Sequence, residues 1–76
     1  MREVKVGQIY HHFKGWNVEV IALAKDSETL EEMVVYYNKD EENPTTWIRN
    51  KKEFLSKVDK NKYPNIEQEY RFEIVG

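Results

Sequence analysis

The chain has 76 residues, with 12 Lys and Arg against 14 Asp and Glu, and no cysteine. This length supports one small domain, residues 1–76, and excludes an enzyme with a separate cofactor domain. The net charge of −2 argues against a general phosphate-binding protein, which normally carries a cationic surplus. The lack of cysteine excludes disulfide frameworks and thiolate metal sites.

No apolar run approaches the length of a secretory or membrane-spanning segment. We therefore expect a cytoplasmic protein that does not contact membranes. Although 34% of the residues are charged, two Trp, five Tyr and three Phe supply large apolar side chains that disordered chains usually lack. The composition favours a folded domain with a small aromatic core.

The first half of the chain predicts a β-hairpin followed by a third strand. Residues 8–13 are rich in β-forming side chains, and Gly15 suits a tight turn before a second strand at residues 17–25. Alternation along this second strand places one set of apolar residues on a common face, namely Val18, Val20, Ala22 and Ala24.

The segment from residue 27 to residue 38 is ambiguous. Leu30, Met33, Val34 and Tyr37 follow helical spacing. The unbroken run of bulky β-forming residues from 33 to 37 favours a strand instead, so we predict a strand from about Glu32 to Asn38. An acidic turn, Asp40 to Pro44, then ends the strand.

The second half predicts two further strands separated by a helix. Residues 45–49 form a short strand with Trp47 and Arg49 on one face. Asn50 then caps a helix over residues 51–58, in a capping-box variant with Glu53. A polar loop at 59–65 leads to a closing strand at residues 70–75.

This order of elements predicts a mainly β domain. A five-stranded antiparallel SH3-like barrel, with one short helical segment before the last strand, would protect the edges that a flat sheet exposes. An OB-type barrel is the alternative. We expect such a domain to be a monomer.

Several segments follow one another in a distinctive order: Tyr10-His11-His12-Phe13-Lys14-Gly15, Ala24-Lys25-Asp26-Ser27-Glu28-Thr29-Leu30-Glu31, Val34-Val35-Tyr36, Trp47-Ile48-Arg49 and Phe54. Together they resemble a family of small bacterial proteins, the domain of unknown function 1653. The resemblance implies an SH3-like barrel and carries no settled activity. Two positions depart from the family pattern, because Asp26 replaces a histidine and Asn50 replaces a proline. The first puts in doubt any mechanism that needs a histidine there, and the second is compatible with helix capping.

The histidines and the hydroxyl residues offer few routes to catalysis. His11 and His12 are neighbours on a strand and point to opposite faces, so they are poorly placed to bind one metal ion, and we expect no metal. Ser27 lacks the Gly-x-Ser-x-Gly elbow of a nucleophile, and Ser27 with Glu28 is typical of a turn bonded to nearby backbone. No catalytic residue and no cofactor are predicted.

A candidate ligand surface combines aromatic and polar residues on several strands. An indole is a flat apolar platform and a guanidinium suits carboxylate or phosphate. If Arg49 pairs with Glu28 and lies near Tyr36 and His12, these residues either lock the fold or line a shallow pocket. The full candidate set is Tyr10, His12, Ser27, Glu28, Tyr36, Trp47 and Arg49.

The net charge conceals a local basic segment after Trp47. Its candidate patch consists of Lys51, Lys52, Lys57, Lys60 and Lys62. A solvated face explains these lysines most simply, and a patch for RNA or a phosphorylated ligand is the other reading.

Three functions follow from these patterns. The leading hypothesis is a non-catalytic binding module whose partner is a protein segment or a small polar ligand. The second is a small enzyme or enzyme accessory that uses His12, Glu28 and Arg49 on a polar ligand. The third is a weak RNA-binding barrel that uses the segment from Lys51 to Lys62; binding of nucleic acid is possible but not favoured.

Overall fold

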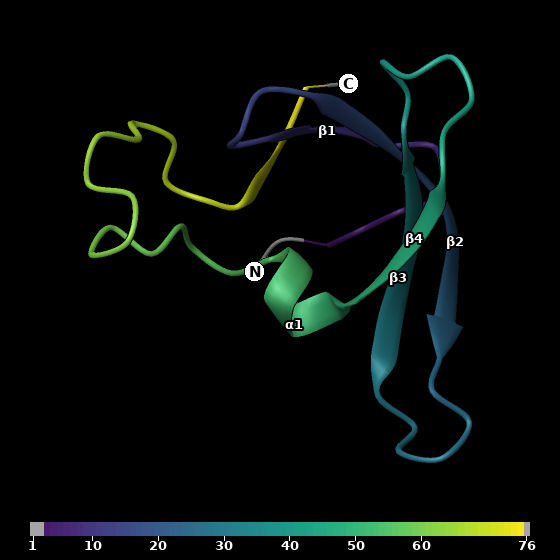
Figure 1. Cartoon of the computed structure of the whole chain (residues 1–76). Coiled ribbons are helices and arrows are strands. Elements are labelled where there is room, and N and C mark those ends of the chain that lie inside the picture. The colour runs from purple at the N-terminus through teal and green to yellow at the C-terminus, as the bar shows by residue number, and fades with distance from the viewer. Residues whose placement is uncertain (1–2, 76) are drawn as a thin grey trace.

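The computed structural model describes residues 3–75, which form one five-stranded antiparallel sheet with a single short helix (Figure 1). The elements in chain order are β1 (Ile9–His12), β2 (Asn17–Lys25), β3 (Glu32–Asn38), β4 (Thr46–Asn50), α1 (Lys51–Phe54) and β5 (Phe72–Ile74). The strands lie in the order β4-β3-β2-β1-β5, and all pairs are antiparallel. This confirms the mainly β fold, including the helical segment before the last strand.

The β1–β2 hairpin turns at Gly15, as the sequence predicts. Gly15 has a φ of +115°, which strains any residue with a Cβ. Its backbone N–H donates to the carbonyl of His12 at 2.9 Å, and the His12 N–H donates to the carbonyl of Trp16 at 2.7 Å. The hairpin therefore holds Trp16 beside the end of β1.

A β-bulge in β2 overturns part of the predicted face assignment. The register shifts between Val20, which is opposite Tyr36, and Ala22, which is opposite Val35. Val18 and Val20, before the bulge, are fully buried. Because the bulge inserts one residue after Val20, Ala22 and Ala24 lie on the other face of the sheet. Strict alternation therefore fails after Val20.

The strand prediction for β3 is confirmed and the length of the helix is corrected. β3 occupies the predicted residues Glu32–Asn38, with two fully or nearly buried side chains that face the core, Val34 and Tyr36. Asn50 caps α1 by accepting the Lys52 N–H at 2.8 Å. The helix ends at Phe54 instead of Val58, because the backbone of Val58 turns back to donate to Glu69 at 2.9 Å.

The core is a cluster of rings and valines on the inner face of the sheet. Phe54 of α1 stacks on Phe72 of β5 with ring centroids 4.2 Å apart, and Tyr10 meets the Phe54 ring edge-on at 5.1 Å. Burying each such ring contributes roughly 1.5–3 kcal/mol to stability. The valines that pack with them are Val4, Val18, Val20 and Val34.

The sheet curls, because strands distant in its order meet across the core. The rings of Phe72 in β5 and Tyr36 in β3 lie 5.5 Å apart, although β2 and β1 separate these strands in the sheet. β4 and β5 remain the two ends of the hydrogen-bonded order, so full closure of an SH3-like barrel stays a prediction. Within residues 3–75, no helix is long and apolar enough to cross a membrane.

Candidate functional site

Two turns meet at one end of the sheet and form the base of the candidate site. Because successive strands alternate in direction, the turn after β1 and the turn between β3 and β4 lie at the same end. The Asn17 N–H donates to the Asp40 carboxylate at 2.8 Å, and the Lys39 N–H donates to the carbonyl of Asn17 at 3.0 Å. The acidic turn is thus attached next to Trp16.

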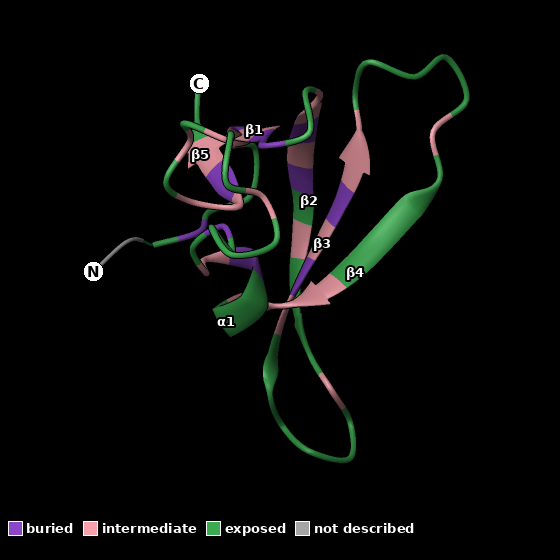
Figure 2. Ribbon diagram, turned by 60° about the vertical axis from the view of Figure 1, so that its left-hand side comes forward, coloured by how far each residue is buried: buried purple, intermediate pink, exposed green. Residues whose placement is uncertain are grey.

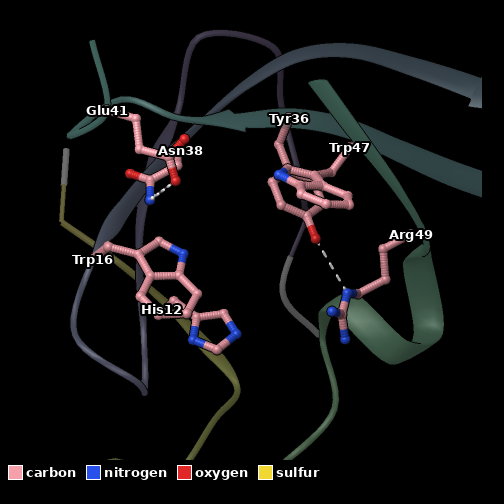
Figure 3. A pocket seen from close by; sticks show the side chains of 7 residues that line it. All are labelled: His12, Trp16, Tyr36, Asn38, Glu41, Trp47 and Arg49. Carbon is pink, nitrogen blue, oxygen red and sulfur yellow. Dashed lines mark hydrogen bonds between the residues drawn. The ribbon is translucent and has the colours of Figure 1, made fainter. Parts of the chain in front are cut away.

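A hollow of about 250 Å³ opens between these turns and the inner face of β3 and β4 (Figure 3). We call it the indole hollow, because both tryptophans of the chain line it. Its lining residues are His12, Trp16, Tyr36, Asn38, Glu41, Trp47 and Arg49. The volume is below the range of drug-sized sites and suits a molecule of about the size of an amino acid.

His12 is a neutral hydrogen-bond donor beneath Trp16. Its ring lies between those of Trp16, at 4.5 Å, and Phe13, at 4.8 Å, and only 6% of the residue is exposed. Burial, together with the positive charges of Arg49 and Lys14, lowers the pKa of His12 from 6.5 to about 4. Because Nδ1 accepts the Lys14 N–H at 3.0 Å, the neutral ring carries its proton on Nε2.

Arg49 places a guanidinium at one end of the indole hollow. Its Nε donates to the Tyr36 hydroxyl at 3.3 Å, and its guanidinium carbon lies 5.6 Å from the centroid of the Phe72 ring. The ion pairs found among residues 3–75 do not include Arg49. A half-buried guanidinium without a carboxylate favours an anionic ligand.

The opposite end of the hollow is acidic. The Asn38 amide donates to the Glu41 carboxylate at 3.2 Å, and Figure 3 shows this pair across the hollow from Arg49. Trp47 stands between the two ends and is 53% exposed. A ligand in the hollow therefore meets an indole wall, a cation at one end and a carboxylate at the other.

A family model for proteins of unknown function, DUF1653, matches residues 8–74. The chain belongs to this family. The membership confirms the resemblance carried by the motifs up to Phe54 and extends it through β5. Comparisons with curated proteins and with solved structures gave no match.

The two positions that the resemblance marks as departures, Asp26 and Asn50, have structural roles in this chain. Asp26 accepts the backbone N–H groups of Glu28, at 2.8 Å, and Thr29, at 3.1 Å, and these bonds lower the pKa of Asp26. Asn50 caps α1. Each residue completes a local backbone turn, as short polar side chains commonly do.

Four of the predicted site residues line the indole hollow, and three do not. His12, Tyr36, Trp47 and Arg49 come together there. Tyr10 is a core residue, 2% exposed, whose hydroxyl donates to Gln8 at 2.7 Å.

Ser27 and Glu28 lie in the turn between β2 and β3, at the other end of the sheet. β3 runs from Glu32, near this turn, to Asn38 in the hollow, so about 20 Å separates the turn from the Asn38 end of the hollow, where Trp16 and Glu41 lie. Arg49 lies opposite Val34, toward this turn, yet the ion pairs among residues 3–75 do not join it to Glu28; the pairing that the sequence left open is not formed, and Arg49 donates to Tyr36 instead.

The basic segment is largely engaged within the chain. Lys51 pairs with Glu32 at 3.3 Å, and Lys57 pairs with Glu69 at 3.4 Å. Lys60 donates to the carbonyl of Gln68 at 2.8 Å, and the Lys62 ammonium lies 5.5 Å from the centroid of the Tyr63 ring. These contacts reduce the charge available for a nucleic-acid backbone.

Sequence reasoning missed three lining residues: Trp16, Asn38 and Glu41. The signal for them was present in the predicted topology. An antiparallel order places the Gly15 turn and the acidic Asp40 turn at the same end, so Trp16 and Glu41 become neighbours without any knowledge of side-chain positions. The same reasoning separates Glu28 from His12, which lies at the end of β1 next to the Gly15 turn.

Proposed function

We propose that this DUF1653 chain is a non-catalytic binding module whose indole hollow takes a small organic anion that carries a flat ring. The observation that carries the proposal is the Arg49 guanidinium, which has no ion pair among the described residues and lies in a hollow walled by exposed indole. Carboxylate or phosphate fits the guanidinium fork, and a planar ring packs against Trp47.

The neighbouring groups support an orientation for the ligand. The Nε2–H of neutral His12 and the guanidinium are both donors, so they favour acceptor oxygens at the Arg49 end. Glu41 repels an anion from the other end. The anionic group of the ligand therefore faces Arg49, and the ring lies between the tryptophans.

The enzyme alternative has less support than binding. A histidine with a pKa of about 4 is a weak base at neutral pH, and Glu28 lies too far from His12 to assist it. The RNA-binding alternative is weakened because Lys51, Lys57, Lys60 and Lys62 already have partners in the chain. Binding of a small ligand in the hollow requires neither a basic histidine nor lysines without partners.

Two indole N–H signals in a proton–nitrogen NMR spectrum report directly on the site, because the chain has only two tryptophans and both line the hollow. Titration with benzoate should shift both signals at millimolar concentrations. Benzamide, a neutral compound of nearly the same shape, should bind at least tenfold more weakly, which corresponds to about 1.4 kcal/mol lost with the ion pair.

Matched variants make the test specific. Arg49→Gln should abolish the benzoate shifts, whereas Lys52→Gln, which removes a positive charge outside the hollow, should leave them unchanged. Glu41→Gln should strengthen benzoate binding, because it removes the repelling carboxylate. Equal binding of benzoate and benzamide, or full binding by Arg49→Gln, would refute the proposed anion site.

A further inference from the structure

The sheet has two ends, and the β4 end is the more exposed one. β4 has five residues with strand pairing on one side only, to β3, within the described chain. β5, at the other end, has three residues. Figure 2 shows β4 exposed over much of its length beside the more buried β3. A long exposed edge strand can pair with a further strand.

Both faces of this edge carry large apolar side chains. Trp47 is 53% exposed on the inner face, and Ile48 is 60% exposed on the outer face. Residues 45–48 carry no charge and consist of β-branched and aromatic types. Natural edge strands usually carry a charge, a bulge or a cover against pairing, and the centre of β4 has no charged side chain before Arg49.

The residues of β4 are self-complementary in one antiparallel register. Two copies of β4 that pair antiparallel in one continuous sheet are related by a two-fold axis perpendicular to the sheet. Because directly opposite residues carry their side chains on the same face, this axis passes between two copies of the same residue. An axis at Ile48 sets Ile48 against Ile48 and places Trp47 of each copy opposite Arg49 of the other. An axis at Arg49 would oppose two guanidinium groups. An axis at Trp47 would leave Arg49 opposite Thr45.

The segments that flank β4 have opposite charges. Asp40, Glu41 and Glu42 precede the strand, and Lys51 and Lys52 follow it. In an antiparallel pair, the start of one β4 lies at the end of the other. The acidic turn of each copy is therefore directed toward the end of β4 in its partner, where Lys52 has no ion pair among the described residues and Lys51 pairs with Glu32 of its own chain. Opposite charges brought near one another attract.

We propose that two copies of this chain associate through β4, in an antiparallel pair centred on Ile48. The five-stranded sheet of each copy then continues into the sheet of the other copy. The pairing sets the indole of Trp47 in the second copy beside the Arg49 guanidinium, in reach of a cation–π contact. The second copy thus adds a residue to the open side of the indole hollow.

Cysteine scanning tests the register, because the natural chain has no cysteine. In Ile48→Cys the two thiols face each other across the axis, within the Cα separation that a disulfide requires. In Thr46→Cys they lie about 13 Å apart along the strands and should not join. The double variant Thr46→Cys, Asn50→Cys should form two bridges. Under mild oxidation, Ile48→Cys should yield a disulfide-linked dimer and Thr46→Cys should form no disulfide between copies.

The mass of the unmodified protein in solution is the second measurement. Sedimentation should show a shift from 9.2 kDa toward twice that value as the protein concentration rises. Ile48→Lys places two ammonium groups face to face and should restore 9.2 kDa at every concentration. Ile74→Lys is the matched control, because Ile74 is a similarly exposed isoleucine, at 54%, on the opposite edge strand.

Ile74→Lys should keep the concentration-dependent mass. A mass that stays at 9.2 kDa at millimolar protein overturns the proposal, even if an extended peptide binds the edge instead. Equal cross-linking of the Thr46 and Ile48 variants overturns it as well, since collision alone would then explain the bridges.

Discussion

The protonation of His12 should make the stability of this small domain depend on pH between neutrality and mild acid. The pKa of His12 falls from 6.5 in the unfolded chain to about 4 in the folded chain, chiefly because burial disfavours the charged ring. Between these values the unfolded state binds more protons than the folded state. The free energy of unfolding must therefore decrease as the pH falls through this window, and it is fully retained only above pH 6.5.

The magnitude follows from the same two values. A pKa change from 6.5 to about 4 corresponds to about 3 kcal/mol, of which about 2 kcal/mol is lost by pH 4.5. A chain of 76 residues has a total stability of roughly 4–11 kcal/mol. The free energy lost when the His12 ring is protonated is thus a large fraction of the total free energy of unfolding. The backbone bonds that lower the pKa of Asp26 act at lower pH, because their contribution is lost only as the pH falls below the ordinary value of 3.8.

Urea unfolding at pH 7 and pH 4.5, at equal ionic strength, measures the effect. The natural chain should lose about 2 kcal/mol between the two conditions. His12→Asn keeps an acceptor for the Lys14 N–H but cannot titrate, so it should start less stable and lose much less on acidification. His11→Asn removes the other histidine and should retain the natural pH dependence. Equal losses in the natural chain and His12→Asn would refute the burial argument.

Three further substitutions test the fold. Phe54→Ala removes a fully buried ring that stacks on Phe72, and it should cost about 3–5 kcal/mol in urea unfolding, whereas a loss below about 1 kcal/mol would contradict the assigned core. Gly15→Ala should cost about 1–3 kcal/mol from strain alone, because φ is +115° and no atom lies within 4 Å of the added Cβ. Asn50→Ala should lower the melting temperature through loss of about 1 kcal/mol of helix capping, and Asn50→Ser, which keeps a capping oxygen and places no carboxylate against Glu31, should restore most of it.

The sequence was sufficient for the elements because their signals are local. The β-forming run at residues 33–37 outweighed the helical spacing, Gly15 marked the hairpin, and Asn50 marked the start of the helix. The predictions that failed depend on contacts between segments that are distant in the sequence. The bulge after Val20 depends on how β2 pairs with β3, and the end of α1 at Phe54 depends on the return of residues 56–58 to the closing segment.

The part of the candidate site that lies on strands could be predicted from the sequence, because the alternation of side chains along a strand is also a local signal. Tyr36, Trp47 and Arg49 share the inner face of adjacent strands, which alternation alone indicates. Trp16 and Glu41 enter the site through turns, and their position depends on the bond between Asn17 and Asp40, which no local pattern encodes. Glu28 lies outside the site because the turn between β2 and β3 holds it, with its backbone N–H bonded to Asp26.

The location of the indole hollow follows from the limited size of the core. The inner face of the sheet is covered by Phe54 and Phe72 near its middle, where Val20 and Val34 are fully buried. Trp47 projects from the same inner face yet is 53% exposed, so the cover ends before it reaches this part of β4. A larger domain would bury such a residue beneath further chain. In a chain of 76 residues, the uncovered flank retains exposed indole next to the guanidinium of Arg49, and these are the groups from which a ligand site can be built.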